Sequence, residues 1–319
     1  TIRTISTDQG LPHNTVHDLL EDTHGQLWIA TEGGLASWDG ANLTAYTTAN
    51  GLPYDRILQL AQAADGELWM ASMGGGVLRY RDGAFSAIDA SDGLANNSVL
   101  SVRAHPESGV WATIWDAGVT HVEDAGQQQY TTTEGLQQNG VSSIYVDRDG
   151  LLWLATQGAG ISVFDDSTFH HLDPAEGMVQ DVVSIAQGSD GSYWFSSSTG
   201  ISRFDGFAFQ SLLERDGLAE NSVMDLLEDG HGNIWIATLG GGVTRYRPSN
   251  SPPPVAVTDV ITETRLGPVD AVRLPSTGAL LAFEFHGISY RTRPGAMLYR
   301  YRLAGHDEDW QATAQSRVE

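Results

Sequence analysis

The stretch that decides the fold is Glu21-Asp22-Thr23-His24-Gly25-Gln26-Leu27-Trp28-Ile29-Ala30-Thr31, because variants of it return along the chain. Its tryptophan recurs at spacings of 41, 42, 42, 41 and 41 residues, as Trp28, Trp69, Trp111, Trp153, Trp194 and Trp235. A glycine followed by leucine or methionine keeps the same step upstream, as Gly10-Leu11, Gly51-Leu52, Gly93-Leu94, Gly135-Leu136, Gly177-Met178 and Gly217-Leu218. A fixed period of this length indicates a repeat architecture.

Each repeat unit contains four short segments with the composition of strands. In the first unit, the pattern and its glycine turns predict strands over Val16–Glu21, Leu27–Thr31, Leu35–Trp38 and Leu43–Tyr46. Four antiparallel strands in about 40 to 45 residues are typical of a propeller blade. Small residues two positions after each tryptophan let neighbouring blades pack face to face, as Ala30, Ala71, Thr113, Ala155, Ser196 and Ala237. We therefore predict an all-β protein whose residues 1–250 form a β-propeller of six repeats of about 41 residues.

The sixth unit lacks a fourth strand after Tyr246, whereas a spare strand-like segment, Ile2–Ser6, precedes the first unit. We expect this N-terminal segment to complete the last blade, because closing the ring removes an exposed sheet edge. Six blades is the favoured number. Seven is the alternative if an upstream blade precedes this sequence.

The phrases Gly10–Val16, Glu21–Thr31 and Gly33–Gly40 closely resemble the two-component regulator propeller repeat, as does Glu228–Thr238. The resemblance recurs six times over roughly residues 1 to 247. It implies the periplasmic sensor region of a bacterial inner-membrane receptor. The output part of such a receptor, a histidine kinase or a diguanylate cyclase, would lie outside this chain, so the resemblance implies a region without catalysis of its own.

Residues 251–319 form a second predicted domain. Ser251–Pro254 reads as a stiff, extended linker, and alternating apolar stretches follow at Val255–Ile261 and Leu280–Phe285. Tyr299–Trp310 resembles the Y_Y_Y domain, an immunoglobulin-like β-sandwich. The pattern stops short of that domain's later strands, so we expect a truncated sandwich. The resemblance implies receptor self-association through this domain in the full-length protein, and membrane contact only through segments absent from this chain.

The composition excludes several classes of protein. A net charge of -23, from 17 basic and 40 acidic residues, disfavours nucleic acid and anionic membrane surfaces as partners. The absence of cysteine rules out disulfides and thiolate chemistry. Neither a phosphate loop nor a nucleophile motif of known type is present. The prediction therefore includes no cofactor, no metal and no catalytic residue.

Candidate ligand residues come from two loops of each unit that strand alternation places at one end of the sheets. These are the loop before the first strand and the loop between the second and third strands. Their variable positions give the candidate ligand-binding residues Trp115, Asp116, Tyr54, Glu32, Gln138, Gln157, His13 and Glu220. Trp115-Asp116 departs most from the repeat, and an indole beside a carboxylate suits the stacking and hydroxyl recognition of a sugar ring. We expect a small polar ligand, neutral or cationic, such as an oligosaccharide.

Other interpretations of these residues stay open. Loop positions vary freely when they carry no function, and Trp115 would serve equally well as packing between blades. A propeller can also act as a scaffold that docks other proteins. A propeller lyase or glycan hydrolase is the enzymatic alternative, in which Glu32, Asp116 and Glu220 would meet as an acid and base pair.

Overall fold

The computed structural model describes residues 4–172, 178–206, 209–248, 255–262, 264–268, 281–287, 299–303, 306–307, 309–313 and 315–318. Contacts divide the chain into two compact parts. The N-terminal part comprises Thr1–Arg203 with Phe209–Tyr246, and the C-terminal part comprises Phe204–Ala208 with Arg247–Glu319.

Five sheets of the N-terminal part each contain four antiparallel strands in chain order. The first sheet has β1 (Val16–Glu21), β2 (Leu27–Thr31), β3 (Gly34–Trp38) and β4 (Leu43–Tyr46). The second and third sheets have β5 (Ile57–Gln62), β6 (Leu68–Ser72), β7 (Gly76–Arg81), β8 (Ala84–Ile88), β9 (Val99–Ala104), β10 (Val110–Ile114), β11 (Val119–Glu123) and β12 (Gly126–Tyr130). The fourth and fifth sheets have β13 (Val141–Val146), β14 (Leu152–Thr156), β15 (Gly160–Phe164), β16 (Phe169–Leu172), β17 (Val182–Gln187), β18 (Tyr193–Ser197), β19 (Gly200–Phe204) and β20 (Phe209–Leu212).

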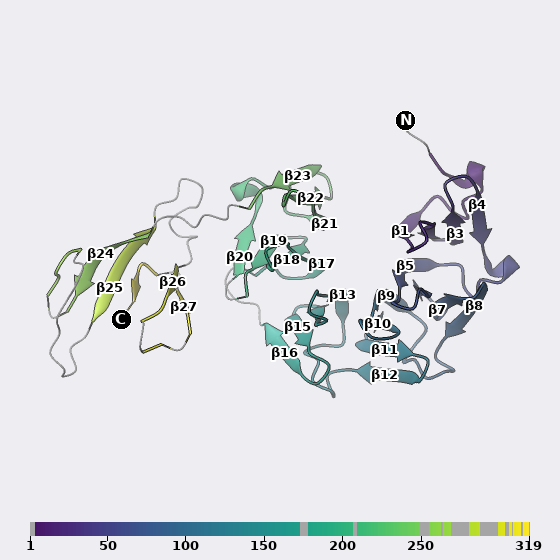
Figure 1. Cartoon of the computed structure of the whole chain (residues 1–319), viewed down its shortest axis with the longest axis horizontal. Coiled ribbons are helices and arrows are strands. Elements are labelled where there is room, and N and C mark those ends of the chain that lie inside the picture. The colour runs from purple at the N-terminus through teal and green to yellow at the C-terminus, as the bar shows by residue number, and fades with distance from the viewer. Residues whose placement is uncertain are drawn as a thin grey trace. The chain divides into compact units, whose positions relative to one another are not determined.

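A sixth sheet has three strands, β21 (Val223–Glu228), β22 (Ile234–Thr238) and β23 (Val243–Tyr246). Single turns of 3-10 helix, η1 (Thr7–Gln9), η2 (Thr48–Asn50) and η3 (Glu214–Asp216), precede the first, second and sixth sheets. The first strand of each sheet lies on the inner side of an arc of sheets, and the fourth strand lies on the outer side (Figure 1). The four strands predicted for the first unit are confirmed, with β3 starting one residue earlier than predicted, at Gly34. The all-β, propeller-type fold is confirmed.

Gly34 shows why glycine opens the third strand. Its φ is +145°, and a Cβ there would lie 2.4 Å from the carbonyl oxygen of Tyr46. Such a contact is far inside van der Waals range, so any side chain at this position would push β4 away from β3.

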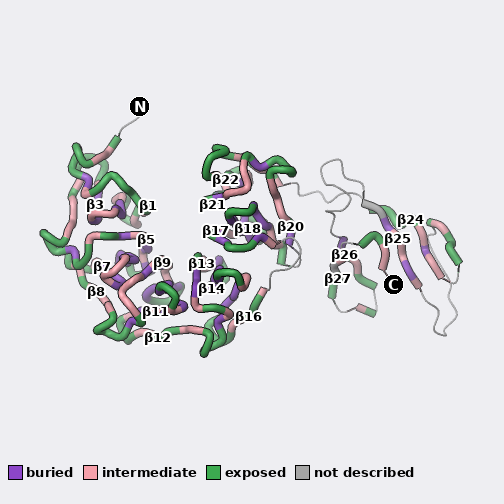
Figure 2. Tube along the Cα trace, turned by 180° about the vertical axis from the view of Figure 1, so that it is seen from behind, coloured by how far each residue is buried: buried purple, intermediate pink, exposed green. Residues whose placement is uncertain are grey.

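The tryptophan of each of the first five repeat units packs against the following sheet. Trp28 lies in one apolar cluster with Leu52, Ile57, Leu60 and Met70 of the second unit. The first five repeated tryptophans are between 1% and 4% exposed. The small residues two positions later are equally buried in the first five units, as predicted for face-to-face packing. Buried residues run along the middle strands, and exposed residues cluster at the turns (Figure 2).

Within the part of the chain that the structure describes, no following sheet covers the sixth one. Trp235 is 40% exposed, Leu227 is 68% exposed and Val243 is 64% exposed. The completion of this sheet by Ile2–Ser6 stays a prediction, because Ile2 and Arg3 lie outside the described residues and Thr4, Ile5 and Ser6 belong to no strand. Ile5 packs against the cluster of Leu11, Ile29 and Ala36 in the first unit.

A capping box follows Ile5, as one follows the end of β4 in the next repeat. The Ser6 hydroxyl accepts a hydrogen bond from the Asp8 amide, and the Gln9 side chain accepts one from the Ser6 amide at 2.9 Å. These bonds turn the chain into η1 directly after Ile5. Thr1, Ile2 and Arg3 lie outside the described residues. That six such sheets, or seven, close a ring stays a prediction.

In the C-terminal part, β24 (Val255–Ile261), β25 (Ala282–Gly287) and β28 (Arg317–Val318) form one sheet, and β26 (Tyr299–Tyr301) pairs with β27 (Gln311–Thr313). Phe285 and Tyr299 make an edge contact with ring centroids 4.8 Å apart, and Phe283 and Val318 pack against them. The sandwich and its Y_Y_Y resemblance stay predictions. The predicted linker Ser251–Pro254 lies outside the described residues. In the described ranges, the structure shows no helix of the length and apolarity needed to cross a membrane.

Candidate functional site

Two loops lie side by side at one end of each sheet, where the candidate residues were predicted. The backbone amide of Trp115 donates to the Ser98 carbonyl at 2.9 Å, and the Gln157 amide donates to the Gly140 carbonyl at 2.8 Å. The equivalent bond from Glu32 to Thr15 is 3.1 Å long. The loop before the first strand is therefore tied to the loop between the second and third strands.

Trp115 and Asp116 form the most exposed part of this end in the third unit. The Trp115 side chain stands in solvent, with 58% of the residue exposed. Its backbone is fixed, because the Asn96 side-chain amide donates to the Trp115 carbonyl at 3.1 Å. Asp116 has a φ of +53°, in the left-handed region that aspartate tolerates better than most residues. The third unit therefore presents an exposed indole on a fixed backbone, beside a carboxylate.

Three other candidate residues fasten the turn of their own unit. Glu220 accepts hydrogen bonds from the amides of Gly240 and Gly241 at 2.6 and 2.7 Å. Tyr54 lies over Gly74 and Gly75 so closely that a Cβ on Gly75 would come 2.3 Å from the Tyr54 Cβ. His13 lies against Gly33, and its Nδ1 accepts from the Thr15 amide at 3.0 Å. These side chains carry a structural role that the sequence interpretation did not include.

Glu32 is held by two basic partners. It hydrogen-bonds His17 Nε2 at 2.8 Å and pairs with Arg56 of the second unit at 3.0 Å. The hydrogen bond with His17 lowers the pKa of Glu32, and together with the charge of Arg56 it outweighs desolvation. A carboxylate with a lowered pKa stays ionised near neutrality, so Glu32 is unsuited to the role of a general acid.

The two remaining candidates are glutamines of the fourth unit. The Gln157 side chain lies over Gly140, where an added Cβ would be 3.0 Å from Gln157 Oε1. Gln138 is exposed. No hydrogen bond or ion pair joins any two of the eight candidates, all of which are among the described residues. Trp115 and Asp116 are therefore the pair that sequence neighbourhood alone brings together.

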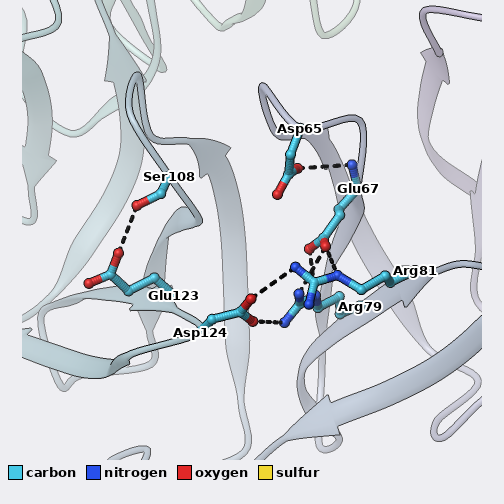
Figure 3. A network of polar contacts seen from close by, with 7 residues as sticks. All are labelled: Asp65, Glu67, Arg79, Arg81, Ser108, Glu123 and Asp124. Carbon is cyan, nitrogen blue, oxygen red and sulfur yellow. Dashed lines mark hydrogen bonds and ion pairs between the residues drawn. The ribbon is translucent and has the colours of Figure 1, made fainter.

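At the other end of the sheets, the structure holds an ion cluster that sequence reasoning missed (Figure 3). Arg79 pairs with Glu67 and with Asp124 of the third unit, each at 2.5 Å, and lies over the Trp69 ring at 4.8 Å. Arg81 contacts Glu67 and also Asp124, the latter at 3.0 Å. Arg79 and Arg81 are two residues apart on β7, so their side chains share a face of the strand. That spacing was the available signal, and the cluster joins the second sheet to the third.

Three segments of the chain match the family model described as two-component regulator propeller, at residues 10–33, 135–158 and 217–240. The predicted resemblance to this repeat is confirmed. The matches include Glu32, Gln138, Gln157 and Glu220. No curated protein sequence matches the chain.

Solved structures show the same fold at low sequence identity. The extracellular domain of a hybrid two-component system from B. thetaiotaomicron aligns with a TM-score of 0.60 and 18% identity over 96% of this chain and 46% of that chain. The chain thus spans about half the length of that protein's domain. Virginiamycin B lyase from Staphylococcus aureus aligns with a TM-score of 0.58 and 16% identity over 74% of this chain and 85% of that one. YCF48 bound to D1 peptide gives a TM-score of 0.54 and 15% identity over 74% and 79%.

Proposed function

We propose that this chain is part of the ligand-sensing region of a bacterial two-component or diguanylate cyclase receptor, on the outer side of the inner membrane. The observation that carries the proposal is the two-component regulator propeller repeat, matched in three of the six units. The fold of an extracellular domain from a hybrid two-component system, aligned along 96% of this chain, supports it. The kinase or cyclase output would belong to other parts of the receptor, and the sensing region itself needs no cofactor.

The proposed ligand site is the loop end of the third sheet, at Trp115 and Asp116. The ligand class is a small, neutral or cationic polar molecule such as an oligosaccharide. An indole exposed to 58% offers an apolar face for a sugar ring, and the adjacent carboxylate accepts hydroxyl hydrogens. Glu220, Tyr54 and His13 support the shape of their loops by fastening glycine turns.

A glycan array followed by calorimetry with each hit tests this proposal. Trp115→Ala should weaken binding of a verified glycan by about 1 to 3 kcal/mol, as for other aromatic anchors. Leu239→Ala is the matched control, because Leu239 occupies the same loop position in the sixth unit and is 69% exposed. Equal affinities for wild type and Trp115→Ala would contradict the site. An array without hits, together with a purified protein partner, would favour the scaffold alternative.

The fold similarity to virginiamycin B lyase favours the enzymatic alternative, but the contacts of Glu32 and Glu220 do not favour an acid and base pair. Glu32 is ion-paired, and one oxygen of Glu220 accepts two backbone amides. Neither carboxylate contacts Asp116. Prolonged incubation with a bound glycan should return it intact, and a cleavage product detected by mass spectrometry would overturn the non-catalytic assignment.

A further inference from the structure

A hollow of about 450 Å³ lies at the end of the sheets opposite to Trp115. Its lining comes from three neighbouring inner strands and the turns that follow them. Gln62 ends β5, Ala104 ends β9 and Val146 ends β13. Because these strands begin at the loop end and finish here, the hollow is separate from the proposed glycan site. The inner strands are neighbours in the arc (Figure 1).

Arg103 of β9 lines this hollow and is an unusual arginine for this protein. Its one hydrogen bond to a described residue runs from Nη1 to the carbonyl of Val102, at 3.1 Å. A guanidinium carries five N–H donors, so most of its donors have no acceptor among the described residues. Arg79 and Arg203, by contrast, each pair with a carboxylate, at 2.5 and 2.8 Å.

The two carboxylates whose charges influence Arg103 form hydrogen bonds with other groups. Burial lowers the pKa of Arg103, and the charges of Asp18 and Asp225 offset part of this shift. Asp18 accepts from the amides of Leu19 and Leu60, each at 2.9 Å. Asp225 accepts from the Ser184 hydroxyl and its own neighbour's amide, each at 2.9 Å. Neither forms an ion pair with Arg103 among the described residues.

The rest of the lining complements a small organic anion. Burial and the nearby His121 lower the pKa of His105, so it is neutral near pH 7 and leaves Arg103 as the cation of the lining. Tyr145 makes no hydrogen bond to another described residue, so its hydroxyl can donate into the hollow. Ala64, Pro106 and Val146 offer apolar surface.

We propose that this hollow is a second binding site, for a small molecule bearing a carboxylate, with Arg103 as its anchor. A carboxylate matches the planar fork of a guanidinium with two parallel hydrogen bonds. The volume of about 450 Å³ falls within the usual range for small-molecule sites. The net charge of -23 does not prevent binding, because salt screens distant charges over about 10 Å at 0.1 M, while the guanidinium lies in the site.

The test uses 4-fluorobenzoate and its neutral counterpart 4-fluorobenzamide, followed by ¹⁹F NMR on the whole chain at constant ionic strength. Acetate, succinate and inorganic phosphate compete in separate titrations. We expect saturable binding of the benzoate below about 10 mM and at least tenfold weaker binding of the amide. Arg103→Gln should weaken benzoate binding at least tenfold, and Arg103→Lys should be intermediate because it keeps the charge without the fork.

Arg148→Gln is the matched control, since Arg148 is an exposed arginine at the turn after β13. It should leave benzoate affinity unchanged. If Arg103→Gln does not fold, the benzoate to benzamide ratio in wild type and the expected twofold or greater loss in Tyr145→Phe decide instead. Equal affinity for both probes, unchanged binding in folded Arg103→Gln, tighter binding of phosphate than of every carboxylate, or no saturable binding of any probe would each overturn the proposal. Trp115→Ala should not alter benzoate binding, so this site and the glycan site can fail independently.

Discussion

The indole of the repeated tryptophan has a hydrogen-bond partner in only some units. Trp28, Trp153 and Trp235 each donate to an aspartate six residues earlier, at 2.9, 2.8 and 2.7 Å. In the second repeat unit that position is Ala63, and Trp69 Nε1 is buried without a hydrogen-bond partner among the described residues. An unpaired buried donor costs free energy.

Ala63→Asp should therefore stabilise the protein. The turn at Ala63 has the same backbone bonds as the turn at Asp22, so the new carboxylate would reach the indole without rearrangement. We expect a gain of about 1 kcal/mol in the free energy of unfolding, measured in urea. Ala64→Asp, one residue further along the exposed turn, should have little effect. A loss of stability in Ala63→Asp, or equal gains in both variants, would contradict this explanation.

Asp22 makes part of the stability dependent on pH. Burial raises its pKa, but hydrogen bonds from the Trp28 indole and the amides of Gln26 and His24 outweigh burial and lower it overall. The folded pKa lies below the unfolded value of about 3.9, so this contribution is present above about pH 4. It is lost as the pH falls through the folded pKa. The difference in unfolding temperature between wild type and Asp22→Asn should therefore shrink from pH 6 towards pH 3, whereas a constant difference would rule out the linkage.

At the scale of the element, the ion cluster of Figure 3 locks two sheets together. The side chains of Glu67 and Arg79 are 9% and 11% exposed, whereas that of Asp124 is 63% exposed. Removing one member of a buried pair strands the other charge, at a cost of about 3 to 5 kcal/mol. Glu67→Ala should approach that range, and Asp124→Ala should cost about 1 kcal/mol or less. Chemical unfolding of both variants and of the double variant measures the coupling, and similar costs for the two single variants would disprove the assignment.

The strands were predictable because tryptophan, small-residue and glycine positions repeat in register through all six units. The role of Glu220, Tyr54 and Asn96 was not predictable in the same way. A carboxylate, an aromatic ring and an amide each hold the neighbouring loop in place by different chemistry. The residue type at this loop position therefore varies between repeats even though its structural role does not. Arg103 did leave a signal. It stands where the other five inner strands carry Leu20, Ala61, Tyr145, Ala186 and Leu227.

The place of the N-terminal segment stays a prediction. The apolar pattern of Ile2–Ser6 suits a strand in any sheet that lacks one. The Ser6 and Gln9 bonds act only over three residues, and the same capping box follows β4 at Thr47 and Asn50. These local bonds therefore fit a fourth strand before them and do not decide which sheet that strand would join.

For the whole molecule, the burial of equivalent tryptophans predicts unequal costs of the same substitution. Trp194 is 1% exposed and Trp235 is 40% exposed, although both occupy the same position of the repeat. Trp194→Ala should cost about 3 to 5 kcal/mol, as for large aromatic residues in cores. Trp235→Ala should cost less than half as much by the same unfolding measurement. Equal losses of unfolding free energy in the two variants would indicate that Trp235 is buried in solution.

Because each sheet packs on the next one, we expect the N-terminal part to unfold as a one-dimensional array does. In such an array the unfolding free energy is a sum of intrinsic terms and nearest-neighbour couplings, so an end member has one coupling and an interior member has two. Among the described residues the first and sixth sheets are the end members, since Leu19 is 59% exposed and Leu227 is 68% exposed. Fraying should start there, and amide protons of β10 and β14 should outlast those of β2 and β22 in native-state hydrogen exchange. Conditions that weaken the couplings would then convert an all-or-none transition into a gradual one that moves inward from both ends.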